Sequence, residues 1–473
     1  MAKALAVAVA ILAVAVPTAA SAQRPLAVKG GTIVDDRGRA VILHGANAVF
    51  KRAPYYPPLT RADFRRMRGW GFNTIRLGVI WAGLEPSPGV IDQGYLKHLD
   101  AIVDLAAEEG FWVLLDMHQD LYAERFGGEG APEWAVKDDG IPFTPVPGDF
   151  ALNYATPAVG RSFTNLWTDR DGIRTEYVRA FTALAERFAG TDSVLGYDLF
   201  NEPTCEFQLG YPCAIPPGGE AATLWLMPLY DQLVPALRAV DDTHPVFYED
   251  SPTVNFGYPF LIGAPGGPAW PYPDQGLSHH VYCSEALNPG PSCPQQEREA
   301  TNNAVAIAAH NDVAPLQTEF GATDDLAPLR RVTRYADAAG EGWLYWQYKT
   351  YGDPTTSASA GPGGADAESI VAVDGRVKTA KARVLARAYP ERIAGTAARW
   401  SFDDRKTVFT LRYRPRGSGP TVVVLPRAAY PHGACTDGRG FDRRSDPERN
   451  RLRLHAERGA ARVVFRAFPC PRG

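Results

Sequence analysis

The sequence predicts an α/β protein, a (β/α)8 TIM barrel followed by a C-terminal antiparallel β-sandwich. Short apolar runs typical of strands alternate with segments of helical periodicity along most of the chain. Chemically reactive side chains follow the ends of these apolar runs, as they do at the active-site face of a barrel. Beyond Tyr389 the pattern changes to the two-residue alternation of antiparallel strands.

Length and charge limit the classes of protein that fit. The chain has 473 residues, more than one ordinary domain, and 45% of them are hydrophobic, enough for a substantial core. A formal net charge of −4 argues against general nucleic-acid binding. The charge is unevenly distributed, because nineteen Lys and Arg residues stand against eight Asp and Glu residues from Ala386 to the end. We expect a monomer.

The N-terminus has the pattern of a cleavable signal peptide. Lys3 provides the positive start, 4–16 form an apolar run, and Ala20-Ser21-Ala22 is a small-residue cleavage site. We expect residues 1–22 to be removed and the mature protein to be secreted. The alternative is an uncleaved anchor, although the run is short for a membrane span.

The elements of the barrel follow in order. A β-hairpin from Leu26 to Leu43, turning at 35–38, is expected to close its bottom. Eight strands are expected at 44–47, Phe72–Ile80, Phe111–Met117, Val194–Phe200, Pro245–Glu249, Gly276–Tyr282, Val313–Thr318 and Trp343–Gln347. Helices are expected from Thr60, a plausible N-cap, to about Gly69, and at Tyr95–Glu109, Gly172–Ala189, Ala221–Val240, before Asp312, and at Asp325–Ala339.

Two further regions complete the organisation. Residues 121–171 show little periodicity and are predicted to be a long functional loop. One more helix leads to Tyr389, and sandwich strands are expected at Val408–Tyr413, Thr421–Leu425, Arg451–His455 and Arg462–Phe468. We therefore predict a barrel domain over 23–388 and a β-sandwich over 389–473.

The six cysteines fall into three local pairs, as expected for an exported protein. The pairs are Cys205 with Cys213, Cys283 with Cys293, and Cys435 with Cys470. Six cysteines allow 15 pairings, so the sequence favours but does not fix these disulfides. A metal site is disfavoured because no C-x-x-C pair or histidine cluster accompanies them.

Two glutamates are the strongest chemical signal. A buried strand starting at Val194 ends in Asn201-Glu202-Pro203, and a second one ends in Glu319, 117 residues later. At strand ends of one barrel the two carboxyl groups would lie close together. A pair of carboxyl groups is what cleavage of a glycosidic bond requires: one protonates the leaving oxygen and the other attacks or activates water.

With these motifs, the chain resembles the family-five glycoside hydrolases over about residues 30–385. Leu199-Phe200-Asn201-Glu202-Pro203 matches the acid/base motif of the family, and Gln317-Thr318-Glu319-Phe320-Gly321 matches its nucleophile motif. The resemblance implies that Glu202 is the acid/base and Glu319 the nucleophile of a retaining reaction. It implies further site roles for Asn201 at the sugar 2-hydroxyl, Arg76 beside the nucleophile, His118, the His280–Tyr282 pair, and Trp346 under the cleaved sugar.

Within this family the chain looks most like endoglycoceramidases. Asp120, Lys51 and Trp167 carry that closer resemblance, which implies contacts to a second sugar. Ordinary loop or surface packing is the alternative for these three residues. The implied substrate is a glycosphingolipid cleaved between its oligosaccharide and ceramide, with a β-glucosidase, glucosylceramidase or glucanase of the same family as the alternative.

A glycolipid substrate leads to three further expectations. The segments 54–59 and 256–272 are candidates for an apolar wall beside the cleavage site. The basic C-terminal domain is a candidate for peripheral contact with a membrane or micelle, the alternative being a solvated face that braces the barrel. The pKa of Glu202 is expected to be raised and that of Glu319, beside Arg76, to be lowered.

No cofactor or metal is expected. The sequence has no P-loop, no G-x-G-x-x-G after a strand, and no His/Asp cluster with ligand spacing. A binding protein on an inactive barrel is disfavoured, because both carboxyl groups are present.

Overall fold

The computed structural model describes residues 23–148, 150–204, 220–258, 274–284, 290–356, 364–417, 419–446 and 450–470. The predicted signal peptide lies outside these ranges, as do Cys205 and Cys213.

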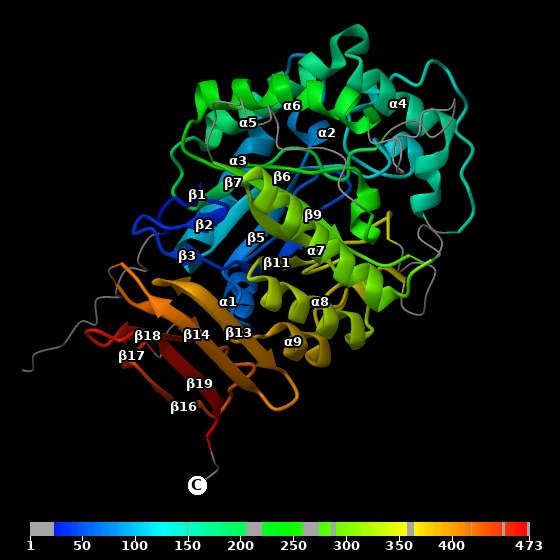
Figure 1. Ribbon diagram of the computed structural model, residues 1–473. Coiled ribbons are helices and arrows are strands. Elements are labelled where there is room, and N and C mark those ends of the chain that lie inside the picture. The colour runs from blue at the N-terminus through cyan, green and yellow to red at the C-terminus, as the bar shows by residue number, and fades with distance from the viewer. Residues whose placement is uncertain are drawn as a thin grey trace, which may run out of the picture.

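The larger part of the chain forms a closed barrel of parallel strands surrounded by helices (Figure 1). The strands are β4 (His44–Ala48), β5 (Thr74–Ile80), β6 (Trp112–His118), β7 (Val194–Asp198), β8 (Val246–Tyr248), β9 (Gln275–Val281), β10 (Ala314–Phe320) and β11 (Gly342–Tyr345). Each lies within about two residues of a predicted strand. The predicted fold class is confirmed.

The helices lie on the outside of the barrel and run between successive strands. They are α1 (Arg61–Gly69), α2 (Trp81–Leu84), α3 (Gln93–Glu109), α4 (Pro157–Trp167), α5 (Ile173–Phe188), α6 (Glu220–Val240), α7 (Cys293–Asn311), α8 (Leu326–Ala339) and α9 (Thr379–Leu385). Thr60 caps α1 in a capping box with Asp63, as its sequence predicts. Gly110 ends α3 in the left-handed conformation that glycine adopts without strain.

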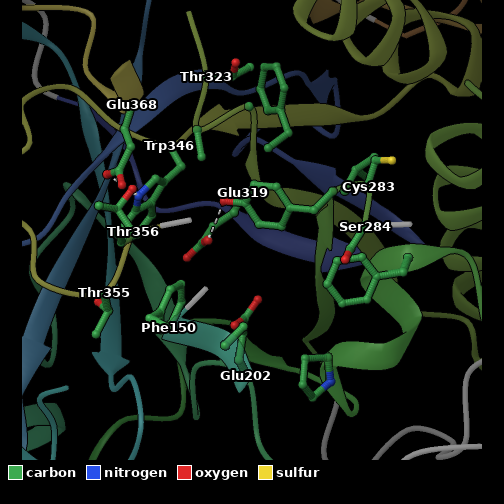
Figure 2. A pocket seen from close by; sticks show the side chains of 18 of the residues that line it. Phe150, Glu202, Cys283, Ser284, Glu319, Thr323, Trp346, Thr355, Thr356 and Glu368 are labelled. Atoms are coloured by element: carbon green, nitrogen blue, oxygen red, sulfur yellow. Dashed lines mark hydrogen bonds between the residues drawn. The ribbon is translucent and has the colours of Figure 1, made fainter. Parts of the chain in front are cut away.

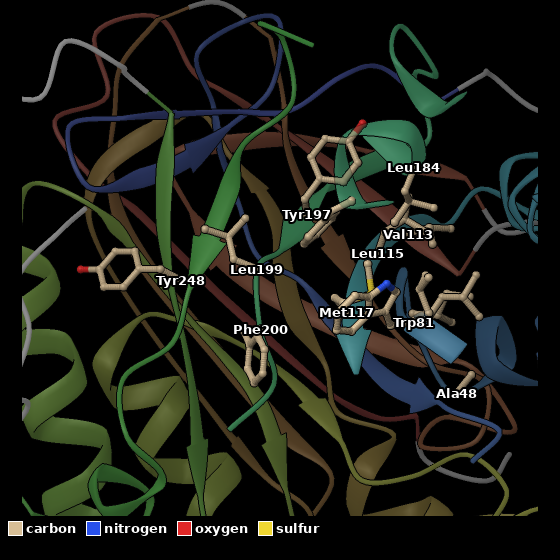
Figure 3. Close-up of a cluster of buried hydrophobic side chains, with 14 of the residues drawn as sticks. Ala48, Trp81, Val113, Leu115, Met117, Leu184, Tyr197, Leu199, Phe200 and Tyr248 are labelled. Carbon is tan, nitrogen blue, oxygen red and sulfur yellow. The ribbon is translucent and has the colours of Figure 1, made fainter. Parts of the chain in front are cut away.

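Successive side chains of β6 point to opposite faces of the strand, so that some of them belong to the hydrophobic core and others to the site. Val113, Leu115 and Met117 point outward into the main hydrophobic core, together with Leu184 of α5 (Figure 3). Trp112 and Leu114 belong to a second cluster inside the barrel. The same alternation places Asp116 and His118 inside the barrel, above that cluster, at the carboxyl end of the strand.

The N-terminal hairpin closes the bottom of the barrel, as predicted. Its strands are β1 (Ala27–Lys29), β2 (Thr32–Val34) and β3 (Ala40–Val41). Leu26, Val28 and Ile33 pack against interior residues of the barrel such as Trp112. Apolar side chains therefore fill the lower half of the barrel, and only the upper half is left for polar chemistry.

The C-terminal module is built of two antiparallel sheets. One has the order β13–β14–β19–β16, and the other the order β1–β2–β3–β12–β15–β18–β17. The strands are β12 (Tyr389–Ile393), β13 (Gly395–Asp403), β14 (Val408–Pro415), β15 (Thr421–Val424), β16 (Ala434–Arg439), β17 (Phe441–Asp446), β18 (Arg451–Ala456) and β19 (Val463–Pro469). The N-terminal hairpin joins the second sheet through β3 and β12, so the sheet continues across the boundary predicted at residue 389.

The segment predicted to be a long loop, 121–171, is only partly irregular. It contains α4, whose buried residues include Phe163 and Trp167, and short 3-10 turns such as Phe150–Ala155. Glycine, serine and threonine in α4 obscure its helical period, which is why the sequence did not reveal it. No helix in the described ranges is long and apolar enough to cross a membrane.

Candidate active site

Arg76 is the centre of the site and lies on β5 inside the barrel. Its side chain is fully buried and reaches carboxylates from four other strands or strand ends. Nη1 donates to Glu319 Oε1 at 2.6 Å and Nε to Asp198 Oδ2 at 2.9 Å. Nη2 donates to Asp116 and Glu249, each at 3.0 Å. One guanidinium thereby fixes the directions of four acidic side chains.

Glu319 lies on β10 and faces the cavity above Arg76. A β-bulge between Gln317 and Glu319 shifts the register, so that Glu319 pairs with His280 on β9. Bulges commonly re-aim a side chain next to an active site. Oε2 of Glu319 accepts a hydrogen bond of 2.9 Å from the Tyr282 hydroxyl, while Oε1 accepts the one from Arg76. Both oxygens are held by donors.

Glu202 follows β7 and approaches Glu319 from the opposite side. Oε1 of Glu202 contacts Nδ1 of His280 at 2.8 Å and accepts a 2.8 Å hydrogen bond from Asn255 Nδ2. Its backbone is left-handed, with φ of 44°, and its N–H donates to Glu249 Oε2 at 2.9 Å. That hydrogen bond stabilises a conformation which costs a non-glycine residue on the order of 1–3 kcal/mol.

The two glutamates face one another across the cavity (Figure 2). An oxygen of Glu202 and an oxygen of Glu319 lie within 4.8 Å of each other, with a nitrogen of His280 equally near. Retaining glycosidases hold their two carboxyl groups about 5–5.5 Å apart, whereas inverting ones need about 6.5–9.5 Å. The separation fits the retaining geometry.

His280, and not its neighbour His279, belongs to the site. Besides Glu202, its ring lies near Glu249 at 3.3 Å and Glu319 at 3.5 Å. Burial by itself would lower the pKa of His280, but Glu249 and Glu319 outweigh it and raise the pKa well above the usual value. His279 instead contacts Glu341 at 3.0 Å. The spacing to Tyr282 therefore identified the correct histidine of the doublet.

The carboxyl groups around Arg76 bind protons as a group. Burial raises the pKa of Asp116 to about 7 and that of Asp198 to about 8, against the opposing effect of Arg76. Burial likewise raises the pKa of Glu319 to about 8, opposed by His280 and Arg76. Glu249 differs, because His280 outweighs burial and lowers its pKa. Three of the four carboxyl groups around Arg76 therefore bind a proton more tightly than a carboxyl group in water does.

The expectation of a lowered pKa for Glu319 is therefore wrong. It assumed one arginine for one glutamate, but Arg76 divides its charge among four carboxylates and the Glu319 side chain is buried. The hydrogen bonds from Arg76 and Tyr282 each act in the opposite direction to burial and favour the ionised form of Glu319, which is the form that can attack a carbon atom. In the described part of the chain, Asp198 Oδ1 has no hydrogen-bond partner, which makes Asp198 a suitable holder of a shared proton.

Lys51 organises the polar side of the site, where Trp346 and His118 also lie. Nζ of Lys51 contacts Asp120 at 2.5 Å and Asp353 at 3.1 Å, and lies 4.5 Å from the centre of the Trp346 ring. Burial lowers the pKa of Lys51, but these carboxylates raise it well above the usual value. Lys51 is thus a buried permanent cation.

Trp346 is fixed from several directions. Its Nε1 donates to Glu368 Oε2 at 3.0 Å, and the His118 ring stacks on it with centroids 5.2 Å apart. Nδ1 of His118 contacts Asp116 at 2.8 Å, while burial and Lys51 lower the pKa of His118 well below its usual value. His118 is therefore neutral and orients the tryptophan.

A cavity of about 890 Å³ opens over these residues. Of the predicted site residues, eight line it: Lys51, His118, Asp120, Asn201, Glu202, Tyr282, Glu319 and Trp346. Arg76 and His280 lie directly beneath and act through the two glutamates. One barrel end thus assembles ten of the eleven predicted residues.

Trp167 is the exception and does not line the cavity. It lies on α4, only 3% exposed, with its ring against Phe163 and Phe200. Its Nε1 donates to the Thr204 carbonyl at 2.7 Å. In the described conformation Trp167 is therefore a core residue, which fits packing, the alternative to the predicted substrate contact.

The cavity has two chemically different sides (Figure 2). Glu368, Thr355, Thr356 and Trp346 lie on one side of the glutamate pair, and Cys283 and Ser284 on the other. The turn Pro252–Phe256 and α8 pack with α7 and the end of β9 around this second side. The apolar lining residues of these elements and of the residues just after the turn are Pro252, Phe256, Tyr258, Val281, Pro328 and Val332. Glu297 and Arg331 also line the cavity there and pair with each other. The glutamates therefore stand between a polar region and an apolar groove.

The predicted apolar wall is partly correct. Phe256 and Tyr258 line the groove, whereas 259–272 lie outside the described residues. The other candidate segment, 54–59, does not line the cavity; Tyr55 and Tyr56 pack toward Tyr95 instead. Phe150 and Leu152 also line it; they belong to 121–171, which was predicted to be a functional loop but not to be part of this wall.

Disulfides are formed by two of the three predicted pairs. Cys283 joins Cys293 beside the apolar groove, and Cys435 joins Cys470 between β16 and the end of β19. The Cys205–Cys213 pair lies outside the described residues. The first disulfide fixes the loop after β9 to the start of α7, where both cysteines line the cavity.

Two groups of side chains in the described ranges have the spacing of metal ligands. They are His118 with Asp120 and Glu129, and Glu202 with His280 and Glu319. In the first group Lys51 already contacts Asp120 at 2.5 Å. In the second, the protonated ring of His280 contacts Glu202. Each carboxylate group thus has a cationic side chain of its own, so neither set favours a divalent ion.

Several site residues were not predicted from the sequence. Glu249 is the last residue of a predicted strand, and the strand-end rule used for Glu202 and Glu319 would have found it. Asp116 and Asp198 also lie in predicted strands at inward positions. Asn255 belongs to the short 3-10 turn Pro252–Phe256, and no local pattern indicates that it would contact Glu202.

Comparison with known proteins agrees with this geometry. Residues 34–352 match the model of the cellulase family, glycosyl hydrolase family 5, and residues 387–464 match the C-terminal domain of that family. Endoglycoceramidase I of Rhodococcus hoagii is 33% identical over 426 residues, covering 86% of this chain and 81% of the relative. An endoglycoceramidase of Hydra vulgaris is 30% identical over 442 residues, covering 85% and 80%.

A solved structure is similar over nearly the whole chain. Endo-glycoceramidase II from a Rhodococcus species, in a complex with ganglioside GM3, has a TM-score of 0.78 and 27% identity. The superposition covers 94% of this chain and 100% of that one. Both the barrel and the C-terminal module are therefore shared.

Proposed function

Because the chain belongs to glycoside hydrolase family 5, we propose that it cleaves the β-glycosidic bond between oligosaccharide and ceramide in glycosphingolipids, with retention of configuration. The observation that carries the proposal is the position of Glu202 and Glu319 between a polar region and an apolar groove. A glycolipid has this division at the bond to be cleaved. The named activity of the similar proteins supports the same substrate class.

The reaction begins when Glu319 attacks the anomeric carbon. Arg76 and Tyr282 hold its two oxygens, so the attacking lone pair has a fixed direction. Glu202 donates its proton to the ceramide oxygen as that bond breaks, and a glycosyl ester to Glu319 forms. The ceramide then leaves along the apolar groove.

Water completes the reaction. Glu202, now a carboxylate, removes a proton from a water molecule that attacks the same carbon and releases Glu319. His280 and Asn255 both donate to Oε1 of Glu202, which leaves Oε2 as the oxygen that carries the transferred proton. Acid and base roles thus fall to a single oxygen whose direction is fixed.

The polar region is proposed to bind the glycan. Trp346 presents its ring under the sugar next to the cleaved bond, where aromatic rings commonly stack on sugar faces. Asp120 and Thr355 line the cavity farther along and offer hydrogen-bonding oxygens to a second sugar, while Lys51 holds both in place. These groups suit a glycan of two or more sugars better than a single glucose.

Product analysis tests the proposal. Lactosylceramide and a ganglioside are incubated with the protein, with Glu319→Ala as the inactive control, and the products are identified by mass spectrometry. We expect intact oligosaccharide and ceramide. Stepwise loss of single sugars, or activity restricted to aryl glucosides and glucans, would contradict the proposal and indicate a simpler β-glycosidase.

We further propose that the protein is exported. The apolar run ending in Ala20-Ser21-Ala22 supports this, as do the disulfides Cys283–Cys293 and Cys435–Cys470, which persist in oxidising compartments. N-terminal sequencing of protein collected from the culture medium is expected to begin at Gln23. Full-length protein confined to the cell fraction would contradict export.

A further inference from the structure

The outer face of the sheet β13–β14–β19–β16 is unusually basic. Five exposed arginines, which we call the arginine face, occupy it: Arg399 on β13, Arg412 and Arg414 on β14, Arg466 on β19 and Arg439 on β16. Leu411 and Tyr413 alternate with the arginines of β14 and are buried in the module's own core. The arginines therefore point away from the protein.

The strand register brings these charges together. Arg399 lies opposite Arg412, Arg412 opposite Val464, and Val464 opposite Arg439. Three arginines and one valine thus form a single row across all four strands. Like charges directly opposite one another destabilise a sheet, so this row has a cost in the isolated protein.

Acidic side chains do not neutralise this face. Arg466 pairs with Asp437 at 3.5 Å. Within the described ranges, the other four arginines form no ion pair. Half-buried Val464 and Phe468 lie between the charges, with the Arg466 guanidinium 5.0 Å from the Phe468 ring. The face thus combines uncompensated positive charge with small apolar areas.

We propose that the arginine face binds an anionic lipid surface. Neighbouring strands lie about 4.8 Å apart, so the charges spread over a surface roughly 15 Å wide and do not converge on a single point. An extended layer of negative headgroups complements such an array, and each surface cation adds to the attraction. The inference stands on the charge distribution and does not rest on the proposed reaction.

The position of the sheet relates this face to the cavity. The turn after β13 is joined to the first part of α8 by the ion pair Arg330–Asp404, with N and O 2.7 Å apart. The same part of α8 provides Pro328, Arg331 and Val332 to the cavity lining. The sheet that carries the arginine face is thus tied to the helix that forms one wall of the apolar groove.

The test is sedimentation with lipid vesicles. The full-length protein is mixed with vesicles of phosphatidylcholine alone or with phosphatidylglycerol added, at low and high salt. The test variant is Arg399→Gln/Arg412→Gln/Arg439→Gln. The matched control, Lys97→Gln/Arg170→Gln/Arg376→Gln, removes the same charge from exposed positions on the barrel. Thermal unfolding and hydrolysis of a soluble aryl glycoside verify that both variants fold.

We expect the wild-type protein to bind the anionic vesicles selectively and to lose this binding in about 1 M salt. The test variant is expected to bind roughly a hundred-fold more weakly, at about five-fold per arginine, and the control variant to bind like the wild type. Equally weakened vesicle binding by both variants would overturn the proposal, as would wild-type binding that does not depend on the charge of the lipid. Retention on heparin without vesicle binding would also overturn it and indicate a soluble polyanion.

Discussion

At the residue scale, two buried cations hold the proposed catalytic pair, Glu202 and Glu319. Arg76 contacts Glu319 from below, and His280 contacts Glu202 while lying 3.5 Å from Glu319. Neither cation lines the cavity, so each acts by positioning a glutamate. The site is therefore organised before substrate arrives, which is how positioned charges contribute most to catalysis.

The acid role of Glu202 makes a prediction about leaving groups. Glu202→Gln cannot donate a proton, so hydrolysis of lactosylceramide is expected to fall by about 10²–10⁴-fold. A dinitrophenyl lactoside has a leaving group that needs no proton, so its first step is expected to survive as a burst of dinitrophenol. Stopped-flow absorbance measures the burst. Equal loss of the burst and of glycolipid hydrolysis would contradict the assignment.

The raised pKa of His280 makes a prediction about pH. A histidine whose pKa is higher in the folded protein than in the unfolded chain stabilises the fold. This stabilisation is fully present below the pKa of the unfolded chain, about 6.5, and is lost as the pH rises through the pKa of the folded protein. The difference in unfolding free energy between wild type and His280→Gln is expected to shrink from pH 6 to pH 9. Chemical denaturation at several pH values measures it.

His118 serves as the matched control for this experiment. Its pKa is lowered well below the usual value by burial and Lys51, so it is neutral in both states above pH 6.5. The difference in unfolding free energy between wild type and His118→Gln should not change from about pH 7 to 9. If neither difference in unfolding free energy changes with pH, His280 is not charged in the folded protein.

At the element scale, α4 is part of the hydrophobic core and not of the substrate site. Trp167 packs in the core, whereas Trp346 lines the cavity. Trp167→Ala is expected to lower the free energy of unfolding by about 3–5 kcal/mol and to leave KM nearly unchanged. Trp346→Ala is expected to raise KM. Denaturant unfolding and steady-state kinetics on a soluble lactoside measure both, and a raised KM for Trp167→Ala would restore its predicted sugar contact.

The sequence predicted those elements whose pattern is local. The barrel strands were found because alternation and strand ends are visible within a few residues, and Glu202 and Glu319 stand at such ends. The helix α4 was missed because glycine and polar residues interrupt its period. Asn255 was missed because its contact with Glu202 arises only when the turn after β8 folds over the barrel.

The charge states depend on more than two residues at a time and were harder to predict. The sequence paired Arg76 with Glu319 correctly, but not with Asp116, Asp198 and Glu249 as well. Since one charge serves four carboxylates, burial dominates and the predicted direction of the Glu319 shift was wrong. Such a reversal follows from the closed barrel and has no local sequence signal.

At the scale of the whole molecule, the C-terminal module is integral to the barrel. Tyr389 stacks on His44 with centroids 3.8 Å apart and donates to the Gly71 carbonyl at 2.9 Å. Trp400 donates to Asp337 of α8, and β12 pairs with β3. Removing the module would expose buried surface at the bottom of the barrel.

Deletion of 389–473 is accordingly expected to prevent stable folding, and not merely to remove lipid binding. Differential scanning calorimetry of the truncated chain should show no cooperative transition near that of the wild type, and activity on a soluble lactoside should be lost. Tyr389→Phe, which removes one hydrogen bond, is expected to cost only about 1 kcal/mol. A truncated chain with wild-type stability and activity would contradict this view.

The central claim, that Glu319 is the nucleophile of a retaining reaction, has one direct test. The protein is reacted with an activated 2-deoxy-2-fluoro lactoside, digested, and analysed by peptide mass spectrometry. We predict a single glycosyl adduct on the peptide that contains Glu319, and its absence in Glu319→Ala. An adduct on another residue, or turnover with inversion and no adduct, would contradict the account.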